Sequence, residues 1–214
     1  VIGDPLYDPY SDALHRLELF HEAGDFQVVI DEAAAMEPIW QLSPRLHYLA
    51  GTAALEFMEV KKDLDILMTP IGGGGLLSGS AIVARHLDPT IRIFAAEPIG
   101  AADTAASFAQ GHRVTDWHPD TIADGLRAMV GKVTFPIIQD LVDDVLTVSE
   151  SAIKRAVNLV WENMNMIIEP SSATVVAAIM ETPKLFAGKK VGMILSGGNI
   201  DPKLFPHLPA VTDD

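Results

Sequence analysis

The sequence predicts an α/β protein with an open, mainly parallel sheet and helices on both faces. Two observations carry this prediction. From about Asp65 onwards, short apolar segments alternate with longer stretches of helical periodicity, which is typical of repeated β-α units. Each short segment is apolar or β-branched and closes on Gly, Pro or Ser. The loops that follow parallel strands meet at one edge of the sheet, where ligands of open α/β folds bind.

Four strands and four helices are expected. The strands cover Asp65–Thr69, Arg92–Ala96, Asp144–Val148 and Lys190–Leu195. The helices cover Leu76–His86, Thr134–Leu141, Glu150–Met164 and Ser171–Met180. Ser149 is a suitable N-cap for the third helix, because a serine hydroxyl accepts a hydrogen bond from a backbone N–H of the first turn.

Residues 1–50 differ from the rest of the chain. They contain two mixed helical stretches, 11–23 and 31–36, and no chemical motif. We expect this segment to pack on the main domain, which we assign to residues 51–214. The chain does not begin with Met, which suggests a fragment or a processed protein.

Composition excludes several classes of function. The chain of 214 residues has 15 Lys and Arg against 29 Asp and Glu, so its formal net charge is -14 and nucleic acid is not an expected partner. It has no cysteine, which excludes thiolate catalysis and thiolate metal sites. No apolar run approaches the roughly 18 residues that would span a membrane, and the first residues lack the features of a signal peptide. We expect no membrane partner and take the cytoplasm as the default location.

The run of four glycines, Gly72 to Gly75, lies between the first strand and the first helix. Fixing each glycine costs about 0.5–1 kcal/mol more than fixing alanine, so the run needs a compensating interaction. Glycine lets a ligand approach the backbone amides closely, and a helix N-terminus favours an anion. The run therefore predicts a phosphate site. The alternative is a flexible turn between strand and helix.

Two nucleotide motifs do not fit this loop. A Walker-type loop needs Gly-Lys-Ser/Thr, but Leu76 and Leu77 follow Gly75. In a dinucleotide fingerprint, Leu77 occupies the position of the third glycine, and only Glu97 follows as a candidate acid. A second loop, Ser196-Gly197-Gly198-Asn199, presents a hydroxyl at the end of the last strand; alone, it would also read as a common turn.

Together these stretches resemble the fold type II pyridoxal-phosphate enzymes, and most closely the serine racemase and serine/threonine dehydratase group. The resemblance covers Gly51 to about Asp201, the C-terminal half to two thirds of a family member. It rests on segments that occur in the family's order: Gly51–Glu56, Gly72–Gly79, Ala96–Pro98, Thr121–Gly125, Phe135–Ile138, Val142–Asp144, Glu169–Ala173 and Ser196–Asn199. It implies an incomplete large cofactor domain of the tryptophan-synthase-β-like fold and, for the full-length family, a homodimer.

The resemblance also implies a site for pyridoxal 5′-phosphate. The cofactor-binding residues that it implies are Gly72, Gly73, Gly74, Gly75, Leu76, Ser196, Glu169 and Gly125. The glycine loop would hold the phosphate, and Ser196 would face the pyridine nitrogen. Glu169 would lie near the ring, or would only favour the start of a helix as a carboxylate. Gly125 would line the ring with its backbone.

A divalent metal site is a further implication of the resemblance. Glu97, Ala101 and Asp103 match the positions that hold the ion in racemase-like members, Ala101 through its carbonyl oxygen. Oxygen ligands suit Mg²⁺, Mn²⁺ or Ca²⁺. From the residues alone, two carboxylates at this spacing would be an ordinary solvated pair.

The reactive lysine of the family lies in an N-terminal segment of the type Ser-x-Lys-x-Arg-Gly-Ala, which this sequence does not contain. No lysine of the chain has that context, so no catalytic residue is assigned. The first hypothesis is an inactive fragment of a dehydratase or racemase of a hydroxyamino acid such as serine, threonine or 3-hydroxyaspartate. The others are a non-catalytic phosphate-ligand-binding module and a half-subunit partner of a lysine-bearing chain.

Overall fold

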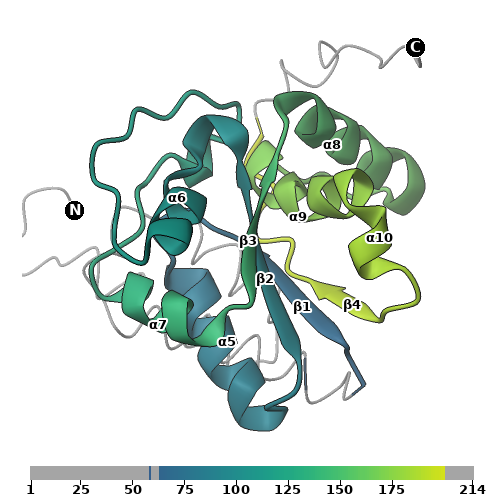
Figure 1. The fold of residues 1–214 in the computed structure, drawn as a ribbon. Coiled ribbons are helices and arrows are strands. Elements are labelled where there is room, and N and C mark those ends of the chain that lie inside the picture. The colour runs from purple at the N-terminus through teal and green to yellow at the C-terminus, as the bar shows by residue number, and fades with distance from the viewer. Residues whose placement is uncertain (1–57, 59–62, 201–214) are drawn as a thin grey trace, which may run out of the picture.

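The computed structural model describes Met58 and residues 63–200. The expected segment 1–50, with its two helical stretches, lies outside the described residues. The described part contains one sheet of four parallel strands in the order β3-β2-β1-β4 (Figure 1). The strands are β1 (Ile66–Pro70), β2 (Arg92–Pro98), β3 (Asp144–Val148) and β4 (Val191–Met193). The predicted open parallel sheet is therefore confirmed.

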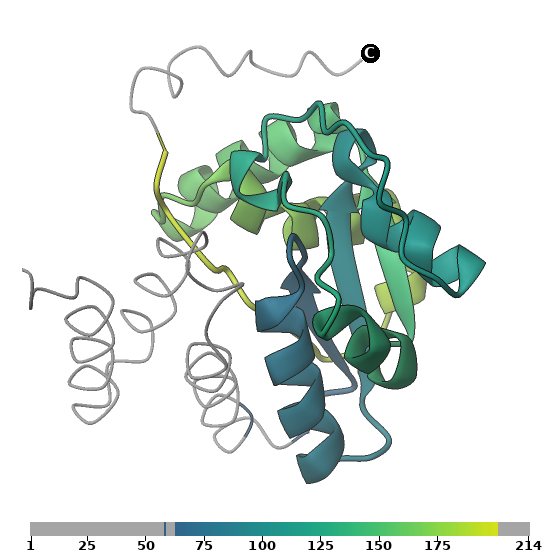
Figure 2. The same ribbon diagram turned by 90° about the vertical axis from the view of Figure 1, so that its left-hand side faces the viewer.

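Helices cover both faces of the sheet, as predicted (Figure 1). One face carries α5 (Gly75–Leu87) and α7 (Thr134–Leu141), which lie side by side in Figure 2. The other carries α8 (Glu150–Met164), α9 (Pro170–Glu181) and α10 (Pro183–Phe186). The helix α6 (Asp103–Gln110) and the short 3-10 turns η1 (Ile99–Ala101) and η2 (Asp124–Leu126) complete the described elements.

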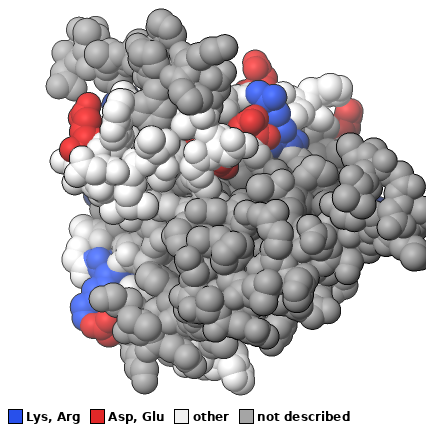
Figure 3. All heavy atoms as spheres, turned by 180° about the vertical axis from the view of Figure 1, so that it is seen from behind, with Lys and Arg blue, Asp and Glu red and all other residues white. Residues whose placement is uncertain are grey.

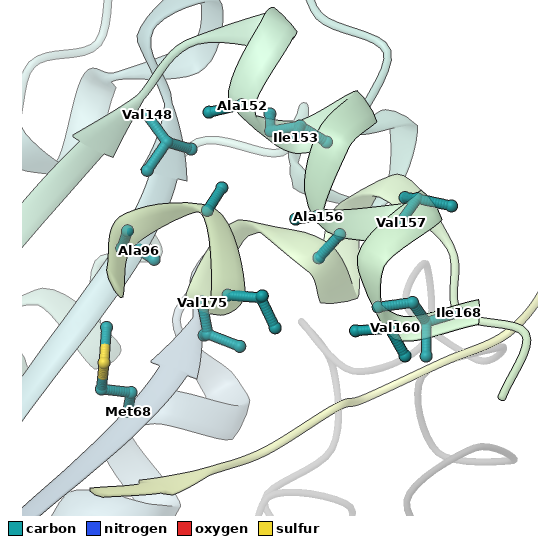
Figure 4. Close-up of a cluster of buried hydrophobic side chains, with 14 of the residues drawn as sticks. Met68, Ala96, Val148, Ala152, Ile153, Ala156, Val157, Val160, Ile168 and Val175 are labelled. Atoms are coloured by element: carbon teal, nitrogen blue, oxygen red, sulfur yellow. The ribbon is translucent and has the colours of Figure 1, made fainter. Parts of the chain in front are cut away.

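Alternating strand residues supply two separate cores. Ile66 and Met68 of β1 face α8 and α9, whereas Leu67 faces α5 and α7. Phe94 and Ala95 of β2 divide in the same way. Both faces are apolar because a parallel sheet is covered on both sides. Figure 4 shows the core between the strands and α8 and α9, built largely from small and β-branched side chains such as Val157.

The order of the strands places the ends of β1 and β4 next to each other. The chain runs outwards from β1 to β2 and β3, and then returns so that β4 pairs with the other side of β1. The backbone N–H of Ile194, just beyond β4, donates to the carbonyl of Met68 at 3.0 Å. A reversal of strand order creates a crevice at the carboxyl ends of the strands, which is the usual ligand position in open α/β folds.

Candidate functional site

The two loops singled out by the sequence flank this reversal. The glycine loop follows β1, and Ser196 to Asn199 follow β4. Glu97 lies near the end of β2, so it belongs to the same carboxyl edge of the sheet. The parallel sheet thus brings together residues that lie far apart in the sequence.

The glycine loop ends at the first turn of α5. Gly74 is the N-cap residue and has a φ of 87°, a left-handed conformation that favours glycine. No side chain caps the helix, and its first turn contains no acidic residue. The N–H groups of a first helical turn have no acceptor within the helix, and they carry the positive end of its dipole. The loop therefore has the properties of an anion site, and these residues suit the phosphate of pyridoxal 5′-phosphate.

The glycine loop also packs against α7 and the residue Gly131 before it. A Cβ on Gly74 would lie 2.8 Å from both Thr134 Oγ1 and Ile138 Cδ1. The carbonyl of Gly73 accepts hydrogen bonds from Thr134 Oγ1 at 2.8 Å and from the N–H of Gly131 at 3.1 Å. Packing against α7 would thus require glycine at position 74 even without a ligand.

The second loop is anchored on the start of α9. The carbonyl of Gly197 accepts from the N–H of Glu169 at 3.1 Å and from Ser172 Oγ at 2.8 Å. Glu169 is the N-cap of α9, and its Oε2 accepts from the N–H of Asn199 at 3.1 Å. These bonds fix the backbone that follows Ser196. The Ser196 side chain is itself buried.

Glu169 is the residue around which three predicted site segments meet. A Cβ on Gly197 would lie 2.9 Å from the Glu169 carboxyl carbon, and one on Gly125 would lie 3.5 Å from Glu169 Oε1. The N–H of Gly125 donates to Ser171 Oγ at 3.1 Å, in the first turn of α9. Gly125, Glu169 and the Ser196 loop are therefore neighbours. Their glycines let the backbone approach the carboxylate closely.

Glu97 and Asp103 form a buried acidic pair beside the same edge. Burial raises the pKa of Glu97 from its usual 4.5 to about 8; the N–H of Ala105, which donates to Oε1 at 2.6 Å, opposes this shift, and the nearby Asp103 adds to it. Burial also raises the pKa of Asp103, although the N–H of Val130 donates to its Oδ2 at 2.9 Å. Ala101, in η1, is buried as well.

The donor set of this pair fits a hard cation. Glu97 would gain from a divalent ion beside it, because burial and the charge of Asp103 both raise its pKa. Backbone N–H groups donate to Oε1 of Glu97 and to Oδ2 of Asp103. No group of three or more His, Cys, Asp or Glu that could hold a metal occurs in the described part of the chain. A third protein ligand would have to be a carbonyl such as that of Ala101.

The sequence reasoning missed the residues that support these loops. Thr134, Gly131 and Ser171 fix the backbone of the glycine loop and of Gly125. Thr134 and Ser171 border or lie within segments used for the family resemblance, but nothing local marked them. Their partners are 61 and 46 residues away in the chain, so only the fold reveals them.

On the face shown in Figure 3, the described Lys and Arg side chains lie beside Asp or Glu and do not gather into a basic patch. None of the helices between residues 63 and 200 is long and apolar enough to cross a bilayer. His112 and His118 are exposed.

Comparison with known proteins places the chain in a family that fits this geometry. The family model described as "Pyridoxal-phosphate dependent enzyme" matches residues 17–197, and the chain belongs to this family. This match starts at residue 17, whereas the resemblance seen in the sequence motifs starts at Gly51.

Individual relatives agree with the family. A serine racemase of Dictyostelium discoideum is 54% identical over 191 residues, which are 87% of this chain and 53% of that protein. The beta-hydroxyaspartate dehydratase of Paracoccus denitrificans (strain Pd 1222) is 40% identical over 158 residues, 74% of this chain and 50% of that protein. The crystal structure of the Dictyostelium discoideum serine racemase superposes with a TM-score of 0.69 at 51% identity, over 74% of this chain and 52% of that one. The chain spans about half the length of the curated relatives it matches.

Proposed function

We propose that this chain is the cofactor-holding portion of a pyridoxal-phosphate-dependent dehydratase or racemase that acts on a small hydroxyamino acid. Serine, threonine and 3-hydroxyaspartate are the candidate substrates. The observation that carries the proposal is that the glycine loop and the Ser196 loop follow two adjacent parallel strands, β1 and β4, at the reversal of strand order. Relatives named as a racemase and as a dehydratase support both reactions.

Each residue has a defined task in this proposal. The amides of Gly72 to Leu76 bind the phosphate, with the dipole of α5 behind them. The Ser196 hydroxyl orients the pyridine ring by a hydrogen bond to its nitrogen. Glu169 holds the loop that carries Ser196, and Gly125 leaves room for this contact. When bound, the cofactor supplies an electron sink that lets the proton at the substrate Cα be removed.

The chemistry of Ser196 suits these reactions. A neutral hydroxyl does not force the pyridine nitrogen to be protonated, as a carboxylate would, so it moderates the ring as an electron sink. Removal of the Cα proton is common to racemisation and to loss of the β-hydroxyl as water. The residue that takes this proton is not assigned, because no lysine of this chain has the family's context.

The proposal extends to a divalent ion, Mg²⁺, Mn²⁺ or Ca²⁺, held by Glu97, Asp103 and the carbonyl of Ala101. Burial raises the pKa of both carboxyls, and the charge of Asp103 raises that of Glu97 further; both observations support it. A homodimer and a cytoplasmic location remain predictions of the sequence, to be tested by light scattering and by fractionation.

A second candidate is a half-subunit that binds the phosphate and is completed by a lysine-bearing chain. It rests on the absence of the family's Ser-x-Lys-x-Arg-Gly-Ala segment from this sequence. Under this candidate, and under that of a non-catalytic module, the isolated chain is inactive but still binds the phosphorylated cofactor.

Titration of the purified chain with pyridoxal 5′-phosphate, followed by visible absorbance, tests the proposal. We expect saturable binding that is tighter than that of pyridoxal and weakened by inorganic phosphate. Borohydride reduction and peptide mapping then show whether a lysine of this chain becomes joined to the cofactor, which separates an active chain from a half-subunit. Equal affinities for pyridoxal and its phosphate would contradict the proposal.

A further inference from the structure

A short segment, Val130 to Thr134, connects the glycine loop to the buried carboxyl of Asp103. At one end, Gly131 N–H and Thr134 Oγ1 both donate to the carbonyl of Gly73, at 3.1 Å and 2.8 Å. At the other end, the N–H of Val130 donates to Asp103 Oδ2 at 2.9 Å. Val130 and Thr134 are buried, so water competes little for these bonds.

The segment fits closely against the loop. A Cβ on Gly131 would lie 2.9 Å from Thr134 Oγ1 and 3.4 Å from the Gly73 carbonyl, so the backbone approaches as only glycine allows. Thr134 Oγ1 also fills the space in front of Gly74, at 2.8 Å from a Cβ built there. The Gly73 carbonyl is thus held away from the amide side of the loop, where an anion would bind.

We infer that Thr134 is a positioning residue for the glycine loop, and that the Val130–Gly131 segment links this loop to Asp103. The inference rests on the proposed function and deepens it. Thr134 does not touch the ligand; it fixes the peptide plane between Gly73 and Gly74, and with it the direction of the Gly74 N–H. Loss of its hydroxyl therefore weakens binding of the phosphate group in particular.

The first test compares affinities for pyridoxal 5′-phosphate and pyridoxal in the purified chain and in Thr134→Val. Removing one neutral hydrogen bond corresponds to about a three- to tenfold loss, and we expect this loss for the phosphorylated form only. Thr134→Ser keeps the hydroxyl and should recover most of the affinity. The matched control is Thr182→Val, which removes a similar bond, Oγ1 to the carbonyl of Ala178 at 2.6 Å, on the other face of the sheet.

The second test needs no ligand. Amide hydrogen exchange of residues 72–77 in the free chain should become faster in Thr134→Val and stay unchanged in Thr182→Val. Asp103→Asn, which weakens a charge-assisted bond, should speed exchange at Val130 and Gly131 and, to a smaller degree, in the glycine loop.

The outcomes separate this inference from the proposed function. A wild-type chain with no preference for the phosphorylated form overturns the proposed function, while exchange still tests the positioning role. A preference that survives unchanged in Thr134→Val, or equal loss of both ligands, overturns the role of Thr134. Unchanged exchange at Gly131 in Asp103→Asn overturns the link to Asp103.

Discussion

Glu97 is a carboxyl group that the fold buries almost completely, with 1% of its surface exposed. Among the described residues it forms no salt bridge, and its Oε1 accepts one backbone N–H. Burial disfavours the charged form, which is why the pKa rises. The folded protein therefore holds a proton at Glu97 more tightly than the unfolded chain does.

The stability of the chain should consequently fall as pH rises from about 4.5, the usual pKa of the group, to about 8, its pKa in the fold. In this window the unfolded chain releases the proton and the folded chain must keep it or bury a charge. We expect Glu97→Gln to remove much of this pH dependence in urea unfolding measured with EDTA present. Parallel pH profiles of the two proteins would contradict the effect of burial on Glu97.

Glycine is required at position 74 for two reasons, its left-handed backbone and its close packing against α7, and substitutions can separate them. Alanine at this position would meet both the left-handed φ of 87° and the contact at 2.8 Å with Thr134 and Ile138. We expect Gly74→Ala to lower the free energy of unfolding by about 2–4 kcal/mol, as the sum of strain and overpacking. Chemical denaturation measures this value.

Gly188→Ala is the matched control, because Gly188 has a φ of 71° but no atom within 4 Å of a built Cβ. It should cost about 1 kcal/mol, from backbone strain alone. Equal losses of unfolding free energy in the two variants would show that the contacts with α7 add nothing to the cost at Gly74.

At the scale of elements, the start of α8 and the end of α9 are joined through Ser149. Its Oγ accepts from the N–H of Ala152 at 3.2 Å, which confirms the predicted N-cap, and donates to Glu181 Oε1 at 2.6 Å. Glu181 Oε2 also accepts from the N–H of Ser149 at 3.2 Å. One side chain thus caps one helix and binds the last residue of the next.

Ser149→Ala should lower the free energy of unfolding by about 1 kcal/mol, the usual value of an N-cap. Ser149→Thr keeps the acceptor and should lose much less. Thermal unfolding of both variants, followed by circular dichroism, measures the difference. Equal loss in the two would mean that the cap hydrogen bond contributes nothing.

Elements with strong local signals were predicted well from the sequence. β3, α7 and α8 have the bounds expected from periodicity, and α5 and α9 differ by one residue at each end. The last strand is shorter than expected, Val191–Met193; the N–H of Ile194 still donates to Met68 of β1, and the chain then runs into the Ser196 loop.

Two short helices were not predicted. α6 has eight residues of mixed polarity and no side-chain cap, and α10 has only four residues after Pro183. Such short helices depend on packing more than on propensity, so the sequence carries little signal for them.

At the scale of the whole molecule, Arg85 joins parts of the chain that are distant in sequence. From α5, its guanidinium donates to the carbonyls of Leu141, Pro89 and Ile91 at 3.1, 3.1 and 2.7 Å, and to Asp143 Oδ2 at 2.8 Å. The ends of α5 and α7 and the start of β2 are thereby tied to one side chain.

Arg85→Lys should destabilise the chain by about 1–2 kcal/mol, because a single ammonium cannot reach this fork of acceptors. Arg85→Ala should cost more, about 2–3 kcal/mol, since the partly buried carbonyls of Leu141 and Ile91 lose a donor. Urea unfolding with a common m-value measures both. A lysine variant as stable as the wild type would show that charge alone is sufficient at this position.

The candidate site was only partly accessible to prediction. Its loops carry glycine and serine patterns that local reasoning recognises, and the order of the strands explains why Gly74 and Ser196 lie at one edge. The supports of the site, such as Thr134 behind Gly73 and Ser172 behind Gly197, act over long sequence distances. No periodicity in the sequence encodes such contacts.

The pairing of β1 with β4 also sets the order of events when the protein is made. β1 and the glycine loop are synthesised early, whereas β4 and the Ser196 loop follow only after α10. At about 5–20 residues per second, this delay on the ribosome is of the order of ten seconds. During that time one edge of β1 has no β4 to pair with, and such an edge is open to aggregation. The proposed cofactor site is therefore complete only after β4 and the Ser196 loop have been made, and chaperones that shield strand edges should matter most before that point.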